Sequence, residues 1–148
     1  MVTGAVVGAK LISRTMEGCT EFYVGLYEVT EDLLDSYDSY YEGISSLTWN
    51  NRPAFDGSNM IDYVPMHNST IGEYVTWDMT ELAKEWYLDD DILNRTIALA
   101  HSGYDQEYSS TYNGYCIFRG YAEADPPLMI VAYRNTVGLE PYYTYSSY

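Results

Sequence analysis

The densest group of metal-ligand side chains in the chain is Asp89-Asp90-Asp91, followed by Asn94. Carboxylate and amide oxygens are the hard ligands that Ca²⁺ prefers, but the central glycine and closing glutamate of an EF-hand loop are missing. The acids follow a predicted helix over 80–88, where the helix dipole disfavours negative charge. The pattern is more typical of solvated charges at a helix end. A bound cation or a Lys/Arg partner is the alternative, which their unfavourable position at the helix end supports.

Catalytic chemistry has little support in the residue pattern. His67 and His101 are the only histidines, and neither lies in an HExxH motif or beside a nucleophile motif. The 22 acidic residues bring some carboxylates close together by chance, so acid pairs alone do not indicate a glycosidase. We therefore expect a protein that is not an enzyme.

Tyrosine is the unusual residue type, with 18 Tyr against 3 Phe and 3 Trp. A buried Tyr hydroxyl needs a hydrogen-bond partner, so this many Tyr predicts that several are half exposed. Exposed Tyr faces suit sugar rings or another protein surface, although Tyr also decorates exposed strand faces without any ligand. Two Tyr-rich loops are the candidate carbohydrate-binding residues: Tyr37, Tyr40, Tyr41, Tyr104, Tyr108 and Tyr112.

Two cysteines, Cys19 and Cys116, are present without a CxxC pair or a zinc-type Cys/His spacing. An even count in a chain of extracellular character allows one disulfide between them. Two buried free thiols are the alternative.

Charge and composition limit the partners. The chain has 148 residues, which is about one domain, and a hydrophobic fraction of 47% is ordinary for a globular fold. A net charge of −15 repels phosphate backbones and anionic membranes, so we expect neither nucleic-acid nor membrane binding. No apolar run approaches the 18 residues of a transmembrane helix, and residues 1–12 lack the charged start and apolar core of a signal peptide. We expect an extracellular or cell-surface location as part of a larger exported protein.

Alternating short segments separated by turn signals predict an all-β fold, a jelly-roll-like antiparallel β-sandwich with one short helix. Residues 1–135 would form this module, and 136–148 a linker or tail. The expected strands are 5–13, 22–29, 60–64, 72–78, 96–102, 115–121 and 128–134, and the helix spans 80–88. The expected core residues are Val7, Leu11, Val24, Leu26, Val75, Trp77, Trp86, Ile97, Leu99, Ile117 or Phe118, and Ile130.

Several motifs follow one another in order: a strand with small residues, a Trp-Asn-Pro turn, a Trp-Asp-hydrophobic-Thr junction, an Asn-led strand, an aromatic strand and a closing Pro-Leu-x-hydrophobic-x-x-Tyr strand. Their residues are Ala9, Leu11, Trp49, Asn50, Asn51, Pro53, Trp77, Asp78, Met79, Thr80, Trp86, Asn94, Ile97, Leu99, Phe118, Pro127, Leu128, Ile130 and Tyr133, with Asn135, Gly138, Leu139 and Glu140 in the tail. Together they resemble the DNRLRE domain, a carbohydrate-binding-module-like family of secreted bacterial and RHS-repeat proteins.

The resemblance implies a non-catalytic carbohydrate-binding module, for which the anionic surface favours neutral or basic glycans. The alternative is a structural spacer or adhesion module that contacts another surface protein and has no small-molecule ligand. The chain departs from the family at Phe118-Arg119-Gly120, where a Ser-Arg-Glu-like sequence is usual. The family's opening strands are also missing before 5–13. That strand or a neighbour is therefore expected to leave an open sheet edge, which invites edge-strand self-association.

Overall fold

The computed structural model describes residues 1–17, 23–30, 54–91, 95–101, 113–120 and 122–134. The candidate Tyr loops, Trp49, Cys19, Asn94 and the tail lie outside these ranges. The described elements are β1 (Val2–Glu17), β2 (Tyr23–Val29), β3 (Phe55–Pro65), the 3₁₀ turn η2 (Asn68–Thr70), β4 (Tyr74–Asp78), α2 (Thr80–Leu88), β5 (Ile97–His101), β6 (Asn113–Phe118) and β7 (Leu128–Tyr133). They form two antiparallel sheets and one short helix, which confirms the all-β sandwich.

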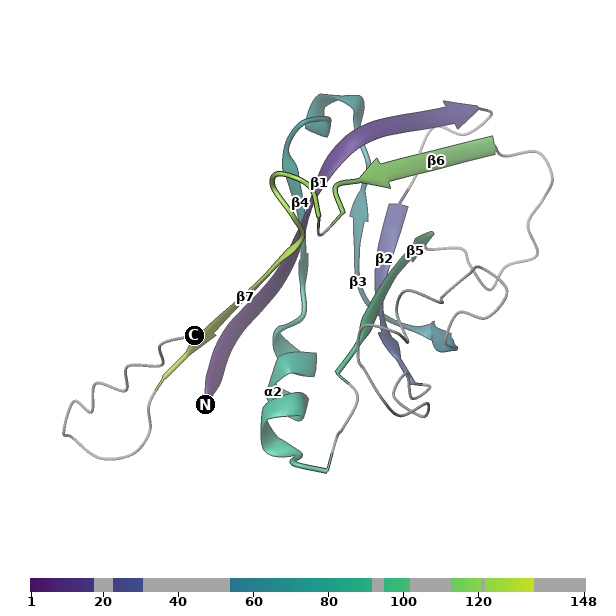
Figure 1. Ribbon diagram of the computed structural model, residues 1–148. Coiled ribbons are helices and arrows are strands. Elements are labelled where there is room, and N and C mark those ends of the chain that lie inside the picture. The colour runs from purple at the N-terminus through teal and green to yellow at the C-terminus, as the bar shows by residue number, and fades with distance from the viewer. Residues whose placement is uncertain (18–22, 31–53, 92–94, 102–112, 121, 135–148) are drawn as a thin grey trace.

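Strand β1 is the central strand of the first sheet, because the other three strands all pair with it. Its N-terminal half pairs with β4 on one side and with β7 on the other, and its C-terminal half pairs with β6. Strands β7 and β6 therefore follow one another along the same side of β1, which Figure 1 shows as a long curved strand. The register shifts between Leu11 and Ser13, at the point where the pairing passes to β6.

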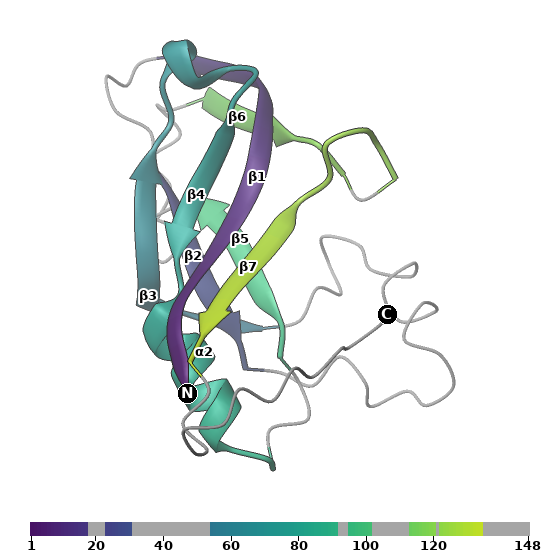
Figure 2. The same cartoon turned by 90° about the vertical axis from the view of Figure 1, so that its left-hand side faces the viewer.

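The second sheet has the order β3-β2-β5, with β2 at its centre. Figure 2 shows this sheet as a layer behind β1, β4 and β7. The Tyr27 side chain is fully buried and occupies the space above Gly25, where an added Cβ would lie 2.8 Å from the Tyr27 ring and hydroxyl. A side chain at Gly25 would therefore displace the largest residue that β2 buries.

The core lies between the two sheets and against α2. Trp77 is fully buried, its indole Nε1 donates to the Val24 carbonyl at 2.8 Å, and its ring meets Phe118 edge to face at 5.9 Å. This hydrogen bond joins β4 of the first sheet to β2 of the second. Of the expected core residues, those buried are Val7, Leu11, Val24, Leu26, Val75, Trp77 and Trp86, and those that pack partly buried against them are Ile97, Leu99 and Phe118.

Helix α2 begins where the sequence predicts. The Asp78 carboxylate accepts the N–H of Thr80, and the Thr80 hydroxyl accepts the N–H of Ala5 on β1 at 3.0 Å. The stripe Leu82, Ala83 and Trp86 is buried, as the 3.6-residue period requires. The helix is therefore fixed to β1 at its first turn and to the core along its length.

One expectation about the core is wrong, because Ile130 is 61% exposed. Of the alternatives Ile117 and Phe118, Phe118 packs against the core and Ile117 is exposed. The strand 5–13 or a neighbour was expected to have an open edge. Strand β1 is paired on both sides along 6–8, with β4 and β7, whereas among the described strands β4, β6 and β7 each pair with β1 alone.

Candidate functional site

The six candidate sugar-binding tyrosines all lie outside the described residues, so their role stays a prediction. The expectation that several Tyr are exposed is confirmed within the described part of the chain, where the exposed ones are Tyr63, Tyr74, Tyr87, Tyr115 and Tyr133. Tyr63 meets Tyr23 across the β2–β3 ladder with an angle of 62° between the rings. This described pair is an edge contact and not a flat platform for a sugar ring.

The three consecutive acids lie at the C-terminal end of α2, and all three are exposed. Among the described residues, no three His, Cys, Asp or Glu side chains are placed so that they could hold a metal ion. The basic partner that the helix dipole favours is Arg95. Its guanidinium donates to the carbonyls of Trp86 and Asp89 at 3.0 and 3.2 Å. The Asp89 side chain accepts the N–H of Asp91, which makes a local turn.

Cys116 carries a free thiol on β6, and its candidate disulfide partner Cys19 lies outside the described residues. Burial raises the pKa of the Cys116 thiol to about 11, against a smaller opposing effect of Arg14. At neutral pH this thiol is therefore protonated and unreactive.

The most unusual surface of the molecule is β7, whose sequence is LMIVAY. All six residues are exposed, and the five large ones are between 42% and 73% exposed. Directly opposite residues of an antiparallel pair face the same side. Met129 and Val131 therefore lie on the core-facing side with Val7 and Ala5, and Ile130 lies on the outer side with Val6. Both faces of β7 thus present apolar side chains to solvent.

Among the described residues, none pairs with the outer edge of the β7 main chain. Met1 and Arg134 exchange their N–H···O bonds, and the main-chain N–H and C=O of Ala5 are directed to Thr80 and Met79, on the side of β1 opposite β7. Main-chain directions alternate along a strand, so the N–H and C=O groups of Val6, next to Ala5, point toward β7. Val6 lies opposite Ile130, and the groups of Ile130 therefore point toward β1. The N–H and C=O groups of Met129, Val131 and Tyr133 point away from it. No described residue bonds to these groups.

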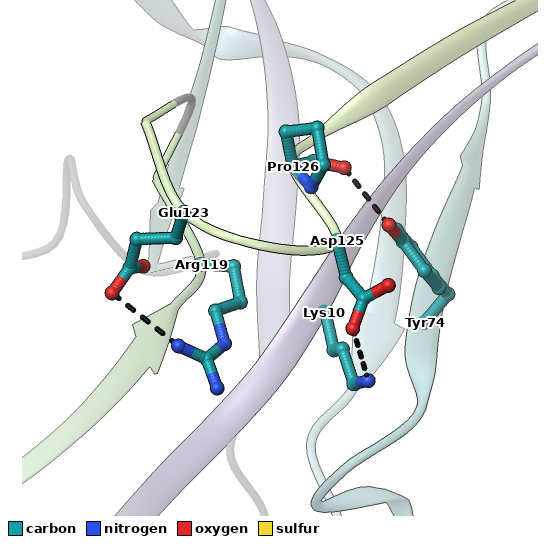
Figure 3. A network of polar contacts seen from close by, with 6 residues as sticks. All are labelled: Lys10, Tyr74, Arg119, Glu123, Asp125 and Pro126. Atoms are coloured by element: carbon teal, nitrogen blue, oxygen red, sulfur yellow. Dashed lines mark hydrogen bonds and ion pairs between the residues drawn. The ribbon is translucent and has the colours of Figure 1, made fainter.

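A polar network fixes the chain between β6 and β7 and so positions β7 (Figure 3). Lys10 on β1 forms an ion pair with Asp125 at 2.8 Å, and the Tyr74 hydroxyl of β4 donates to the Pro126 carbonyl at 2.9 Å. The Tyr74 ring crosses β1 over Gly8, where an added Cβ would lie 3.4 Å from it. The start of β7 is therefore tied to two strands of its sheet.

The same turn contains a residue in the left-handed backbone region. Asp125 has φ of 57°, a conformation that Asp and Asn adopt more readily than other non-glycine residues. Its carboxylate accepts a hydrogen bond from Lys10, and this bond and the lysine's charge lower the pKa of Asp125. Beside it, Arg119 and Glu123 form a second ion pair at 3.4 Å. These contacts stabilise the turn before β7 and so place β7 at the edge of the sheet.

Strand β7 therefore combines an outer edge that no described residue pairs with and apolar side chains on both faces. An edge strand with free N–H and C=O groups and apolar side chains on both faces is a template for another strand. The sequence contains the signal for this site, because 128–133 has neither a charge nor a proline. The same run also fits a buried strand, which is why the sequence pattern assigned Ile130 to the core.

None of the described helices is long and apolar enough to cross a membrane. Comparisons with protein-family models, with curated proteins and with solved structures gave no match. The resemblance to the DNRLRE domain therefore stays a prediction. The fold and the exposed strand β7 are the features from which a function can be inferred.

Proposed function

We propose that the chain is a non-catalytic adhesion or structural module of a larger exported protein, and that it docks another polypeptide by strand addition at β7. The observation that carries this proposal is the exposed, unpaired and uncharged edge strand. Proteins usually protect such edges with charges, prolines or a covering element. Here the protective residues flank the strand, as Pro126 and Pro127 before it and Arg134 after it. They limit the pairing to 128–133 and leave that stretch open.

The charge of the module gives this docking a preferred partner. The net charge of −15 favours strands with basic flanks and disfavours acidic ones. Main-chain hydrogen bonds would supply affinity, and the apolar side chains on each face of β7 would select alternate residues of the incoming strand. The acid-rich surface also suits an extracellular location.

Fluorescence anisotropy with a labelled model strand tests this proposal. The probe is a nine-residue peptide of alternating valine and threonine with a lysine at each end. We expect it to bind wild-type protein and to slow amide exchange in 128–133. Val131→Pro removes an N–H that points away from β1, so the ladder with β1 remains while pairing at the free edge is blocked.

Leu88→Lys is the matched control, because Leu88 is exposed at the far end of α2. It should bind the peptide as wild type does. Equal binding by wild type and Val131→Pro, or protection of amides elsewhere than 128–133, would show that β7 is not the docking strand.

Carbohydrate binding is the second candidate, and the observation that favours it is the exposed side chain of Tyr63, although Tyr23 meets that ring edge to face and does not extend it into a platform. A glycan array with wild type and with Tyr63→Ala tests the described pair, and substitution of Tyr37, Tyr40 and Tyr41 by alanine tests one of the predicted loops. Neutral or basic glycans retained by wild type and lost by either variant would support this function. No retained glycan would leave strand docking as the remaining proposal.

A further inference from the structure

Strand β7 has an edge that fits a second copy of itself. The main-chain groups that point away from β1, and to which no described residue bonds, belong to Met129, Val131 and Tyr133, which are spaced symmetrically about Val131. We propose that β7 pairs antiparallel with β7 of a second copy of this chain, about a twofold axis at Val131. This inference rests on the proposed function, since it names the polypeptide that the open edge binds.

The register follows from the direction of the free groups. Only residues whose N–H and C=O point outward can exchange bonds across the new ladder. With Val131 on the axis, Val131 faces its own copy and Met129 faces Tyr133 of the other, which gives about six main-chain hydrogen bonds. The pairs on the opposite face are Ile130 with Ala132, and Leu128 with Arg134. Every outward-pointing group of 128–133 then has a partner.

The ends of the strand are complementary in an antiparallel arrangement. Arg134 follows β7, and Asp125 precedes it by three residues. In the antiparallel dimer Arg134 of each copy lies opposite Leu128 of the other, on the side of Asp125. A parallel arrangement would instead bring like charges together at each end. Pro127 has no N–H to donate, so the ladder ends there and the register cannot slide far in that direction.

The size and charge of the contact predict a weak, salt-dependent dimer. A standard stable interface buries about 800 Å² on each partner, and a six-residue strand offers less than that. Each copy also carries −15, so repulsion opposes the approach at low ionic strength. The Debye length falls from roughly 20 Å at ~0.02 M salt to about 4–5 Å at ~0.5 M, which removes most of this repulsion. Pairing through apolar side chains and main-chain bonds does not weaken with salt in the same way.

Sedimentation velocity of the full chain at ~0.02 M and ~0.5 M salt tests the dimer. We expect a monomer at low salt and a concentration-dependent dimer at high salt. Val131→Lys places two like charges opposite each other on the axis and should remain monomeric at both salts. The control Leu88→Lys carries the same change in charge and should dimerise as wild type does. Circular dichroism spectra that match wild type show that both variants fold.

Cysteine substitution tests the register itself. Only a residue on the twofold axis faces its own copy, so Val131→Cys should form a disulfide-linked dimer on mild oxidation at high salt. Ile130→Cys faces Ala132 of the other copy and should remain largely unlinked, and wild type gives the background from Cys19 and Cys116. Equal crosslinking of the two variants would overturn the register.

The self-pairing and the docking proposal can fail separately. A wild-type chain that is monomeric at both salts but binds the valine-threonine peptide at 128–133 would overturn the dimer and retain strand docking. A chain that neither dimerises nor binds the peptide would overturn both. A dimer that forms equally well with Val131→Lys would show that the copies meet through another surface.

Discussion

Trp77 joins the two sheets, and its replacement measures how much that junction stabilises the fold. Its side chain is fully buried, packs edge to face on Phe118, and donates to the Val24 carbonyl at 2.8 Å. Trp77→Ala removes the ring and leaves a cavity, for which about 3–5 kcal/mol is typical. At about 2–4 °C per kcal/mol for a chain of this size, the melting temperature should fall by roughly 10 °C.

Trp77→Phe separates the hydrogen bond from the packing. A phenyl ring keeps most of the apolar contact with Phe118 but cannot donate to the Val24 carbonyl, which loses its bond to the indole. Loss of one hydrogen bond of this kind costs about 0.5–1.5 kcal/mol net, so this variant should lie between wild type and Trp77→Ala.

Thermal unfolding and urea unfolding, each monitored by circular dichroism, give the melting temperature and the free energy of unfolding of each variant. Tyr87→Ala is the control, because Tyr87 is exposed on α2 and its loss should change stability by less than about 0.5 kcal/mol. If Trp77→Ala unfolded at the same temperature as wild type, the assignment of Trp77 to the core between the sheets would be wrong. A Trp77→Phe variant as stable as wild type would show that the indole hydrogen bond contributes nothing net.

Three further outcomes follow from the packing and the titrating groups. Gly25→Ala should destabilise the fold by about 1–3 kcal/mol in urea unfolding, because its Cβ would lie 2.8 Å from the Tyr27 ring; wild-type stability would mean that the ring moves freely. The pKa of Asp125 is lowered in the folded state, so its ion pair with Lys10 stabilises the fold above about pH 4 and is lost as pH falls through the folded pKa. The melting temperature of Lys10→Met should therefore fall less between pH 5 and 2 than that of wild type, and a fall equal to that of wild type would contradict this. Cys116, with its pKa raised to about 11, should react slowly with iodoacetamide at pH 8 and faster as pH approaches 11, whereas a thiol that stays unreactive even after unfolding would show that it is in a disulfide.

Local sequence patterns were sufficient for much of the fold. Alternation in 5–13 placed Val7 and Leu11 on a buried face, and the Trp77-Asp78 junction placed the start of α2 correctly. These predictions succeed because strand alternation and helix entry depend on residues close together in the chain. The helix dipole likewise favoured a cationic group at this end of α2, and Arg95 donates there to the main-chain carbonyls of Trp86 and Asp89.

The candidate site depended on contacts between distant parts of the chain. The run LMIVAY fits a strand buried on both faces as well as it fits an exposed edge, and only the layers around it separate the two. Strand β1 pairs with β4, β6 and β7 through residues that are 64 to 131 positions apart in the sequence, and this pairing places β7 at the edge of the sheet. The sequence alone therefore determined where most of the described strands lie and which face of most of them is apolar, although β1 and β3 extend beyond the predicted 5–13 and 60–64. The tertiary structure decided which apolar strand is left exposed. Burial depends on which elements pack against a strand, and the local sequence pattern does not contain that information.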